Sequence, residues 1–119
     1  MKLSLLLSAT ALALANHASA FYGQMAASDY SANEGGVYQI IYLTDYSTGS
    51  TYSGTLYGGF NSCTSTECSI SFHETSVGTY SFTSLMWRTS DGCHNIDFKG
   101  AFDAGHGYCC GSLPCNFSA

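Results

Sequence analysis

Six cysteines constrain this chain more than any other feature, because all of them follow an N-terminal segment typical of a secretory signal. A positively charged start precedes an apolar stretch over residues 3–14, and Ala18-Ser19-Ala20 has the small-x-small pattern that signal peptidase accepts. In an oxidising compartment cysteines form disulfides. We therefore predict a secreted, extracellular protein, with a signal peptide at 1–20 and a single disulfide-rich β domain at 21–119.

The cysteines predict three disulfides and no free thiol; they are Cys63, Cys68, Cys93, Cys109, Cys110 and Cys115. Adjacent residues of an extended chain point in opposite directions, so Cys109 and Cys110 should have different partners. Cys63 and Cys68 bracket a short loop and suit a local bridge. Cys93 would then pair with Cys109 or Cys110, and the remaining one with Cys115. Zinc binding fits neither these spacings nor the compartment.

Charged side chains are scarce in the predicted mature chain, and most of them are acidic. Arg88 and Lys99 are its two fixed cations, against eight Asp and Glu residues. Such a surface repels phosphate backbones and anionic lipids. It argues against a nucleic-acid scaffold role and against a cationic membrane-lytic peptide, but not against an enzyme that meets RNA through a small local site. After the signal no apolar run is long enough to span a bilayer.

Strand signals dominate residues 21–119. Residues 36–44 are rich in β-branched and aromatic side chains and are apolar on both faces, which predicts a central strand. Residues 45–50 predict a turn, and Ile70 and Phe72 alternate with polar residues in a further strand. Residues 21–33 suit a short strand, a helical turn or a mobile arm, and 104–115 an irregular, disulfide-pinned tail. We predict an all-β, mainly antiparallel fold, a small disulfide-stabilised β-sandwich or barrel.

The dipeptide Asp91-Gly92 predicts a hairpin, because both positions of a tight two-residue turn must tolerate positive φ. Centring the turn there pairs Trp87 with Ile96 and Leu85 with Phe98. These four apolar residues are then expected in the core.

The same register has two further consequences. Tyr80 and Phe82 fall on the opposite parity, so a bulge near Thr83 is needed to bring them to the same face. His94 lies on the Trp87 face and Arg88 on the other, so the two do not converge.

The pool for acid–base chemistry is small: His73, Glu74, Arg88, His94, Asp97, Asp103 and His106. A ribonuclease could use a carboxylate, one or two histidines and an arginine. A metal site built from His94, Asp97, Asp103 and His106 would be divided between two strand faces. We therefore assign no catalytic residue, no metal and no cofactor, and leave the binding residues open. Asn116 begins a glycosylation sequon close to the chain end, and its use stays open.

The signal, the six cysteines, the single small domain and the scarcity of charge resemble the small secreted cysteine-rich proteins of filamentous fungi. This resemblance implies an effector, a virulence-type protein that binds a host or competitor protein or glycan outside the cell, as a monomer and through its loops. Two alternatives remain. The acidic composition, rich in Tyr, Gly and Ser, resembles the guanine-specific fungal ribonucleases and implies a small hydrolase; an antimicrobial or killer-type toxin is the other.

Overall fold

The computed structural model describes residues 20–75 and 78–119 of the chain. Residues 1–19, which hold nearly all of the predicted signal peptide, lie outside the described residues. Antiparallel strands make up most of the described part, as predicted. No helix in that part is long and apolar enough to cross a membrane.

Nine strands of the described chain form one antiparallel sheet. They are β1 (Tyr22–Ala27), β2 (Ser31–Asn33), β3 (Gly36–Asp45), β4 (Thr51–Tyr57), β5 (Cys68–Glu74), β6 (Ser81–Arg88), β7 (Cys93–Asp97), β8 (His106–Cys110) and β9 (Cys115–Ser118). The order across the sheet is β8-β7-β6-β5-β4-β3-β1-β9, and β2 pairs with the beginning of β3. Two short 3₁₀ helices, η1 (Phe60–Ser62) and η2 (Ala101–Asp103), lie in the connections. The sheet is thus an up-and-down meander whose last strand returns beside the first.

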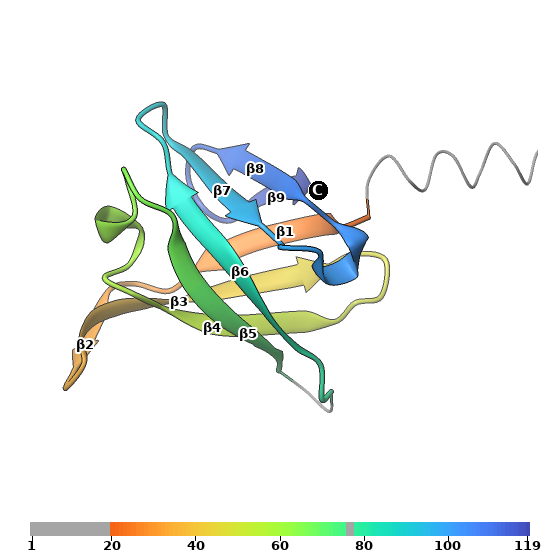
Figure 1. The fold of residues 1–119 in the computed structure, drawn as a ribbon, viewed down its shortest axis with the longest axis horizontal. Coiled ribbons are helices and arrows are strands. Elements are labelled where there is room, and N and C mark those ends of the chain that lie inside the picture. Colours follow the sequence, from red (N-terminus) through yellow and green to blue (C-terminus); the bar gives the residue numbers. More distant parts are fainter. Residues whose placement is uncertain (1–19, 76–77) are drawn as a thin grey trace, which may run out of the picture.

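The sheet curls until its two end strands, β8 and β9, lie side by side (Figure 1). A glycine makes this approach possible, because a Cβ atom at Gly107 on β8 would lie 2.6 Å from the carbonyl oxygen of Ser118 on β9. The Cys109–Cys115 disulfide ties the same two strands together. The result is a nearly closed barrel, which is one of the two predicted architectures and leaves little free sheet edge.

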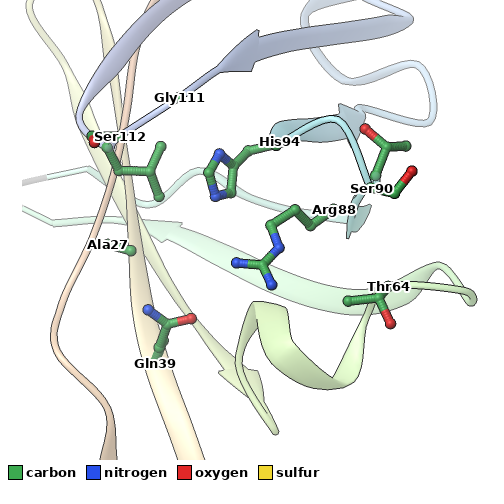
Figure 2. Close-up of a pocket in the computed structure, with 11 residues that line it drawn as sticks. Ala27, Gln39, Thr64, Arg88, Ser90, His94, Gly111 and Ser112 are labelled. Atoms are coloured by element: carbon green, nitrogen blue, oxygen red, sulfur yellow. The ribbon is translucent and has the colours of Figure 1, made fainter.

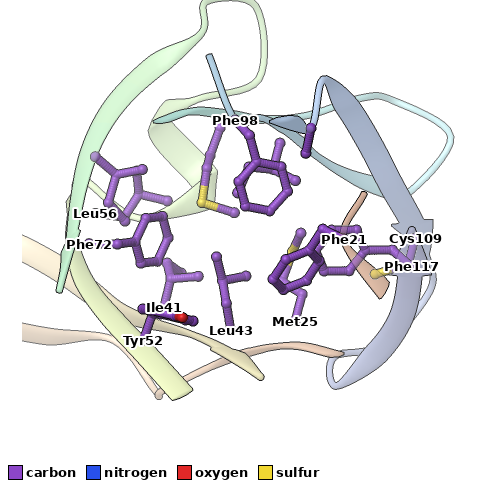
Figure 3. Close-up of a cluster of buried hydrophobic side chains, with 14 of the residues drawn as sticks. Phe21, Met25, Ile41, Leu43, Tyr52, Leu56, Phe72, Phe98, Cys109 and Phe117 are labelled. Atoms are coloured by element: carbon purple, nitrogen blue, oxygen red, sulfur yellow. The ribbon is translucent and has the colours of Figure 1, made fainter. Parts of the chain in front are cut away.

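Apolar side chains fill the barrel and seal one of its ends (Figure 3). The fully buried ones include Met25, Ile41, Leu43, Leu56, Ile70, Phe72, Met86 and Ile96. At the sealed end the ring of Phe21 lies 4.9 Å from that of Phe98 and 5.3 Å from that of Phe117. Phe102 of η2 adds a fourth ring, 5.4 Å from Phe21. We call this aromatic end the closed end.

The hairpin between β6 and β7 forms as predicted, but its loop has three residues rather than two. Thr89 pairs with Cys93 through its backbone N–H, and Gly92 turns back to the carbonyl of Thr89 with a φ of 86°. The loop is therefore Ser90, Asp91 and Gly92, a three-residue hairpin with glycine at the left-handed position. Asp91 stabilises it by accepting a hydrogen bond from the backbone N–H of Cys93.

One extra loop residue moves every side chain of β6 to the other face relative to β7. Met86, not Trp87, faces Ile96, and Leu85 pairs with Asp97. Ile96 and Phe98 are buried as predicted, whereas the predicted burial of Leu85 and Trp87 in the core is wrong. Both are half-buried and have the strand parity opposite to Met86, although Trp87 still packs against the buried cluster.

The predicted bulge near Thr83 is also absent from β6, whose pairing with β5 is continuous from Ser81 to Met86. Phe82 and Met86 share one parity, so no irregularity is needed to bring both toward the interior.

Both terminal segments are more regular than expected. The segment 104–115, predicted to be irregular, contains all of β8 and begins β9. Residues 21–33 supply β1, which lies between β3 and β9, and the short β2. Of these strands, β2 and β8 pair with their neighbours in the chain, β3 and β7, whereas β1 and β9 pair with each other across almost the whole domain.

The three disulfides are Cys63–Cys68, Cys93–Cys110 and Cys109–Cys115, and no cysteine of the described chain is free. The local bridge and the separate partners of Cys109 and Cys110 agree with the prediction. All three lie at the end opposite the closed end, where β6 ends and β7 begins. We call this the open end.

Candidate binding site at the open end of the barrel

A cavity of about 890 Å³ lies at the open end. Its walls come from the first halves of β3 and β7, from the last residues of β1 and β6, and from the loops that the disulfides hold. The lining residues are Ala27, Gln39, Thr64, Arg88, Thr89, Ser90, Gly92, His94, Gly111, Ser112 and Leu113. This volume is typical of a small-molecule site, and the mouths of β-barrels are a common place for such sites.

Arg88 and His94 meet in this cavity. They are directly paired across β6 and β7, and Figure 2 shows both side chains extending from neighbouring strands into the same space. The prediction that they lie on opposite faces is wrong, because it depended on the two-residue turn. With the three-residue loop, both share the inward face of the barrel with Met86 and Ile96.

Arg88 is half-buried and has no acidic neighbour in the cavity wall. Its guanidinium donates a hydrogen bond to the side-chain oxygen of Asn61 at 3.3 Å, which is long for such a bond. Its backbone N–H donates to the carbonyl of Cys63, which ties the end of β6 to the Cys63–Cys68 loop. The backbone is therefore fixed while most of the guanidinium's five N–H donors remain available.

His94 is 92% buried, with only 8% of its surface exposed. The ring of Phe60 packs edge-on against it at 4.7 Å, and Nδ1 is buried with no hydrogen-bond partner in the described chain. Burial lowers the pKa of the imidazole, and the positive charge of Arg88 lowers it further. The polar backbone of Cys109 raises the pKa, but its effect is smaller than the other two. The lowered pKa favours the uncharged imidazole at neutral pH.

Gln39 has a structural part in the same wall. Its side-chain oxygen accepts a hydrogen bond from the backbone N–H of Phe60, and its nitrogen donates to the carbonyl of Ser28. The hydroxyl of Tyr30 accepts a further bond from the backbone N–H of Asn61. The bonds to Phe60 and Asn61 tie η1 to Gln39 and Tyr30, and the bond to Ser28 fixes the Gln39 side chain itself, so hydrogen-bonded polar groups hold this side of the cavity in place.

The other candidate residues lie elsewhere. His73 is exposed and pairs with Ser81 at the start of β6, whereas Arg88 ends that strand. Seven strand residues separate the two positions by roughly 20 Å. Glu74 is beside His73, and Asp103 lies in η2 at the closed end. Of the seven candidates, only Arg88 and His94 line the cavity.

His106 belongs to the outer face of the barrel. Its ring stacks between those of Trp87, at 5.5 Å, and Tyr108, at 5.8 Å. Its Nε2 makes a 2.8 Å hydrogen bond with the side-chain oxygen of Asn95, and Asp97 is its partner across β7 and β8. These rings cover Asn95, which explains why an outward-facing amide is buried. Trp87 is thus part of an outer aromatic cluster.

Sequence reasoning missed most of the cavity wall. One signal was present: Gln39 has the same strand parity as Ile41 and Leu43, so a polar residue interrupts the inward apolar row of β3. Such an interruption marks the position where the core ends and a polar site begins. Thr64, Ser112 and Leu113 lie in loops that the disulfides bring together. No pattern of neighbouring residues in the sequence predicts that contact.

The arrangement combines one positive charge, one neutral imidazole, several hydroxyls and two aliphatic groups in a concave surface. Among the described residues, no carboxylate lines it to act as a general base, and no cluster of three or more His, Cys, Asp or Glu could hold a metal ion. The chemistry that these groups favour is recognition of a polar ligand. No protein-family model, curated protein or solved structure matches the chain.

Proposed function

We propose that this protein is secreted, acts outside the cell by binding a host or competitor molecule, and uses the open end of the barrel as its binding site. One observation carries the proposal: the two ends of the barrel differ. Aromatic side chains seal the closed end, whereas the open end holds a cavity with Arg88 and His94 in its wall. Burying a polar group costs free energy unless the group is hydrogen-bonded. Polar side chains at one end of an otherwise apolar barrel therefore favour a binding function at the open end.

The placement of the disulfides supports the same proposal. Cys63–Cys68 closes the loop after η1, Cys93–Cys110 fixes the β6–β7 hairpin, and Cys109–Cys115 closes the β8–β9 loop. All three loops border the cavity or adjoin its wall. Loops that are held before binding lose less conformational entropy when a ligand arrives. Three disulfides are also compatible with an extracellular protein.

The alternative is a small ribonuclease-like hydrolase, and one observation favours it: Arg88 and His94 share a cavity. An arginine can stabilise a phosphorane-like charge and a histidine can transfer a proton. The candidate carboxylate Glu74 and the second histidine, His73, lie at the far end of β5, however. General acid–base catalysis needs its groups around one reacting centre, so binding is the better supported function.

The test uses oxidised protein of residues 21–119, labelled with ¹⁵N. It is mixed in turn with single-stranded RNA, cell-wall oligosaccharides and a panel of neutral and charged small molecules. We expect at least one class to shift the amide signals of residues 89–92 and 111–113 while its own mass stays unchanged. Shifts confined to residues 98–104 at the closed end would contradict the proposed site. RNA cleavage that is lost in His94→Ala would instead establish the hydrolase.

A further inference from the structure

We propose that the cavity at the open end is a receptor for a small organic acid, whose single carboxylate binds the guanidinium of Arg88 beside the imidazole of His94. This inference rests on the proposed function, because it names the ligand class for the same site.

The charge of the cavity is opposite to that of the chain. Residues 21–119 contain eight acidic residues and two fixed cations, Arg88 and Lys99. One of these cations is in the cavity wall, and none of the acids is. Within the described part of the chain, the hydrogen-bond partner of the guanidinium is the neutral amide of Asn61, at 3.3 Å. The planar donors of a guanidinium match a carboxylate in two parallel bonds, so an arginine in a cavity wall without an acidic neighbour is well suited to an anionic ligand.

His94 provides a second and independent indication. It is 92% buried and its side chain extends toward the cavity, and its Nδ1, which solvent does not reach, has no hydrogen-bond partner in the described chain. Buried polar groups without partners are rare in folded proteins. A ligand that places a polar group against Arg88 would lie beside this imidazole, because the two residues are directly paired across β6 and β7.

The amount of charge favours a carboxylate over a phosphate or sulfate ester. Among the described residues of the cavity wall Arg88 is the only one with a fixed charge, and burial together with this charge lowers the pKa of His94 and favours its neutral form. One positive charge balances one negative charge. A phosphate dianion would bring an excess charge into a partly desolvated site, which is unfavourable.

The size of the cavity indicates a free small molecule. Its volume of about 890 Å³ suits a ligand with an organic body in addition to the acid group. Leu113 and Ala27 contribute apolar surface to the wall, and Thr64, Ser90 and Ser112 contribute hydroxyl groups. The ligand is therefore expected to combine a carboxylate with a mixed polar and apolar body.

The experiment compares benzoate with benzamide, which has nearly the same shape and no charge, and with inorganic phosphate. Amide shifts of ¹⁵N-labelled oxidised protein at pH 7 give the dissociation constants. We expect benzoate to shift residues 89–92 and 111–113 and to bind at least about tenfold more tightly than benzamide, since bonds to a charged partner are the stronger ones. Phosphate is expected to bind more weakly than benzoate.

Two variants locate the effect. Arg88→Gln is expected to weaken benzoate binding by about tenfold or more and to leave benzamide unchanged. Lys99→Gln is the matched control, because it removes the same charge from the loop after β7 at the closed end and should leave both affinities unchanged. Spectra of the free variants must overlay with those of the parent away from the substituted residue. Should Arg88→Gln unfold, Arg88→Lys keeps the charge, removes the planar fork, and should weaken benzoate severalfold.

Each contrary result has a distinct meaning. Equal binding of benzoate and benzamide at the open end, unaffected by Arg88→Gln, would overturn the organic-acid inference and leave the proposed function standing. Tighter binding of phosphate than benzoate would overturn the choice of carboxylate. Absence of benzoate binding at millimolar concentration would also overturn the organic-acid inference. The panel of RNA, oligosaccharides and small molecules would then still test whether the open end is a binding site.

Discussion

At the scale of single residues, the neutral state of His94 links the stability of the fold to pH. The pKa of this imidazole is lowered by burial and by Arg88, the charged group that faces it. In the unfolded chain a histidine has a pKa near 6.5. Below about pH 6.5 the unfolded protein therefore binds a proton at this histidine more readily than the folded protein does. The free energy of unfolding consequently decreases as the pH is lowered.

We predict that stability declines when the pH is lowered from about 7.5 to 5.5, and that His94→Gln removes most of this decline. Urea unfolding of the oxidised protein at several pH values measures both. The lowered pKa of the Asp91 carboxyl, caused by hydrogen bonds from Thr89 and the backbone of Cys93, acts only at lower pH, because its ordinary value is 3.8. A decline of the same size in His94→Gln would show that another group is responsible.

At the scale of secondary-structure elements, the β6–β7 hairpin decides which residues form the core and which form the site. Met86 is fully buried and faces Ile96, whereas its neighbour Leu85 is half-buried on the outer face. We predict that Met86→Ala lowers the free energy of unfolding by about 2–5 kcal/mol. Leu85→Ala should cost no more than about 1 kcal/mol, because less of its surface leaves water. Urea unfolding of the two variants checks this, and a larger loss for Leu85→Ala would contradict the three-residue loop.

The same hairpin shows how far the sequence could lead. Turn chemistry at Asp91-Gly92 correctly located the hairpin, but the glycine occupies the third loop position rather than the second. A shift of one residue exchanges the two faces of a strand. The bulge required near Thr83 was the sign of this error, since the observed register needs none. The error also separated Arg88 from His94 and so concealed the site.

Other elements were predictable for local reasons. The alternation at Ile70 and Phe72 and the turn over residues 45–50 depend on neighbouring residues, and both are present. The pairing of β1 with β9 depends on segments at opposite ends of the domain. No pattern of neighbouring residues predicts such a contact. For this reason the strands within residues 21–33 and 104–115 were only partly predicted from the sequence. The cavity wall shares this dependence on distant partners.

At the scale of the whole molecule, closure of the barrel depends on the contact between β8 and β9. We predict that Gly107→Ala destabilises the fold by about 1–3 kcal/mol, because the added methyl group would lie 2.6 Å from the Ser118 carbonyl oxygen and 2.9 Å from the ring of Phe117. Gly105→Ala is the matched control, since a Cβ there has no neighbour within 4 Å. It should be neutral, or stabilising by up to about 1 kcal/mol. Thermal unfolding compares the two, and equal melting temperatures would mean that the β8–β9 contact does not hold the barrel closed.

The stability of the whole molecule also depends on its disulfides, although all three lie at the open end. Each bridge typically contributes about 2–4 kcal/mol, and a domain of this size has a total stability of roughly 5–15 kcal/mol. The three together are thus comparable to the total, so we predict that reduction unfolds the protein at 37 °C despite its aromatic closed end. Amide-signal dispersion and the thermal transition, measured before and after reduction, test this. A reduced chain that keeps both would show that the apolar core suffices, and the bridges would then serve only to hold the loops around the cavity. Loss of both would mean that the protein folds only where its cysteines can be oxidised, which is the condition met outside the cell.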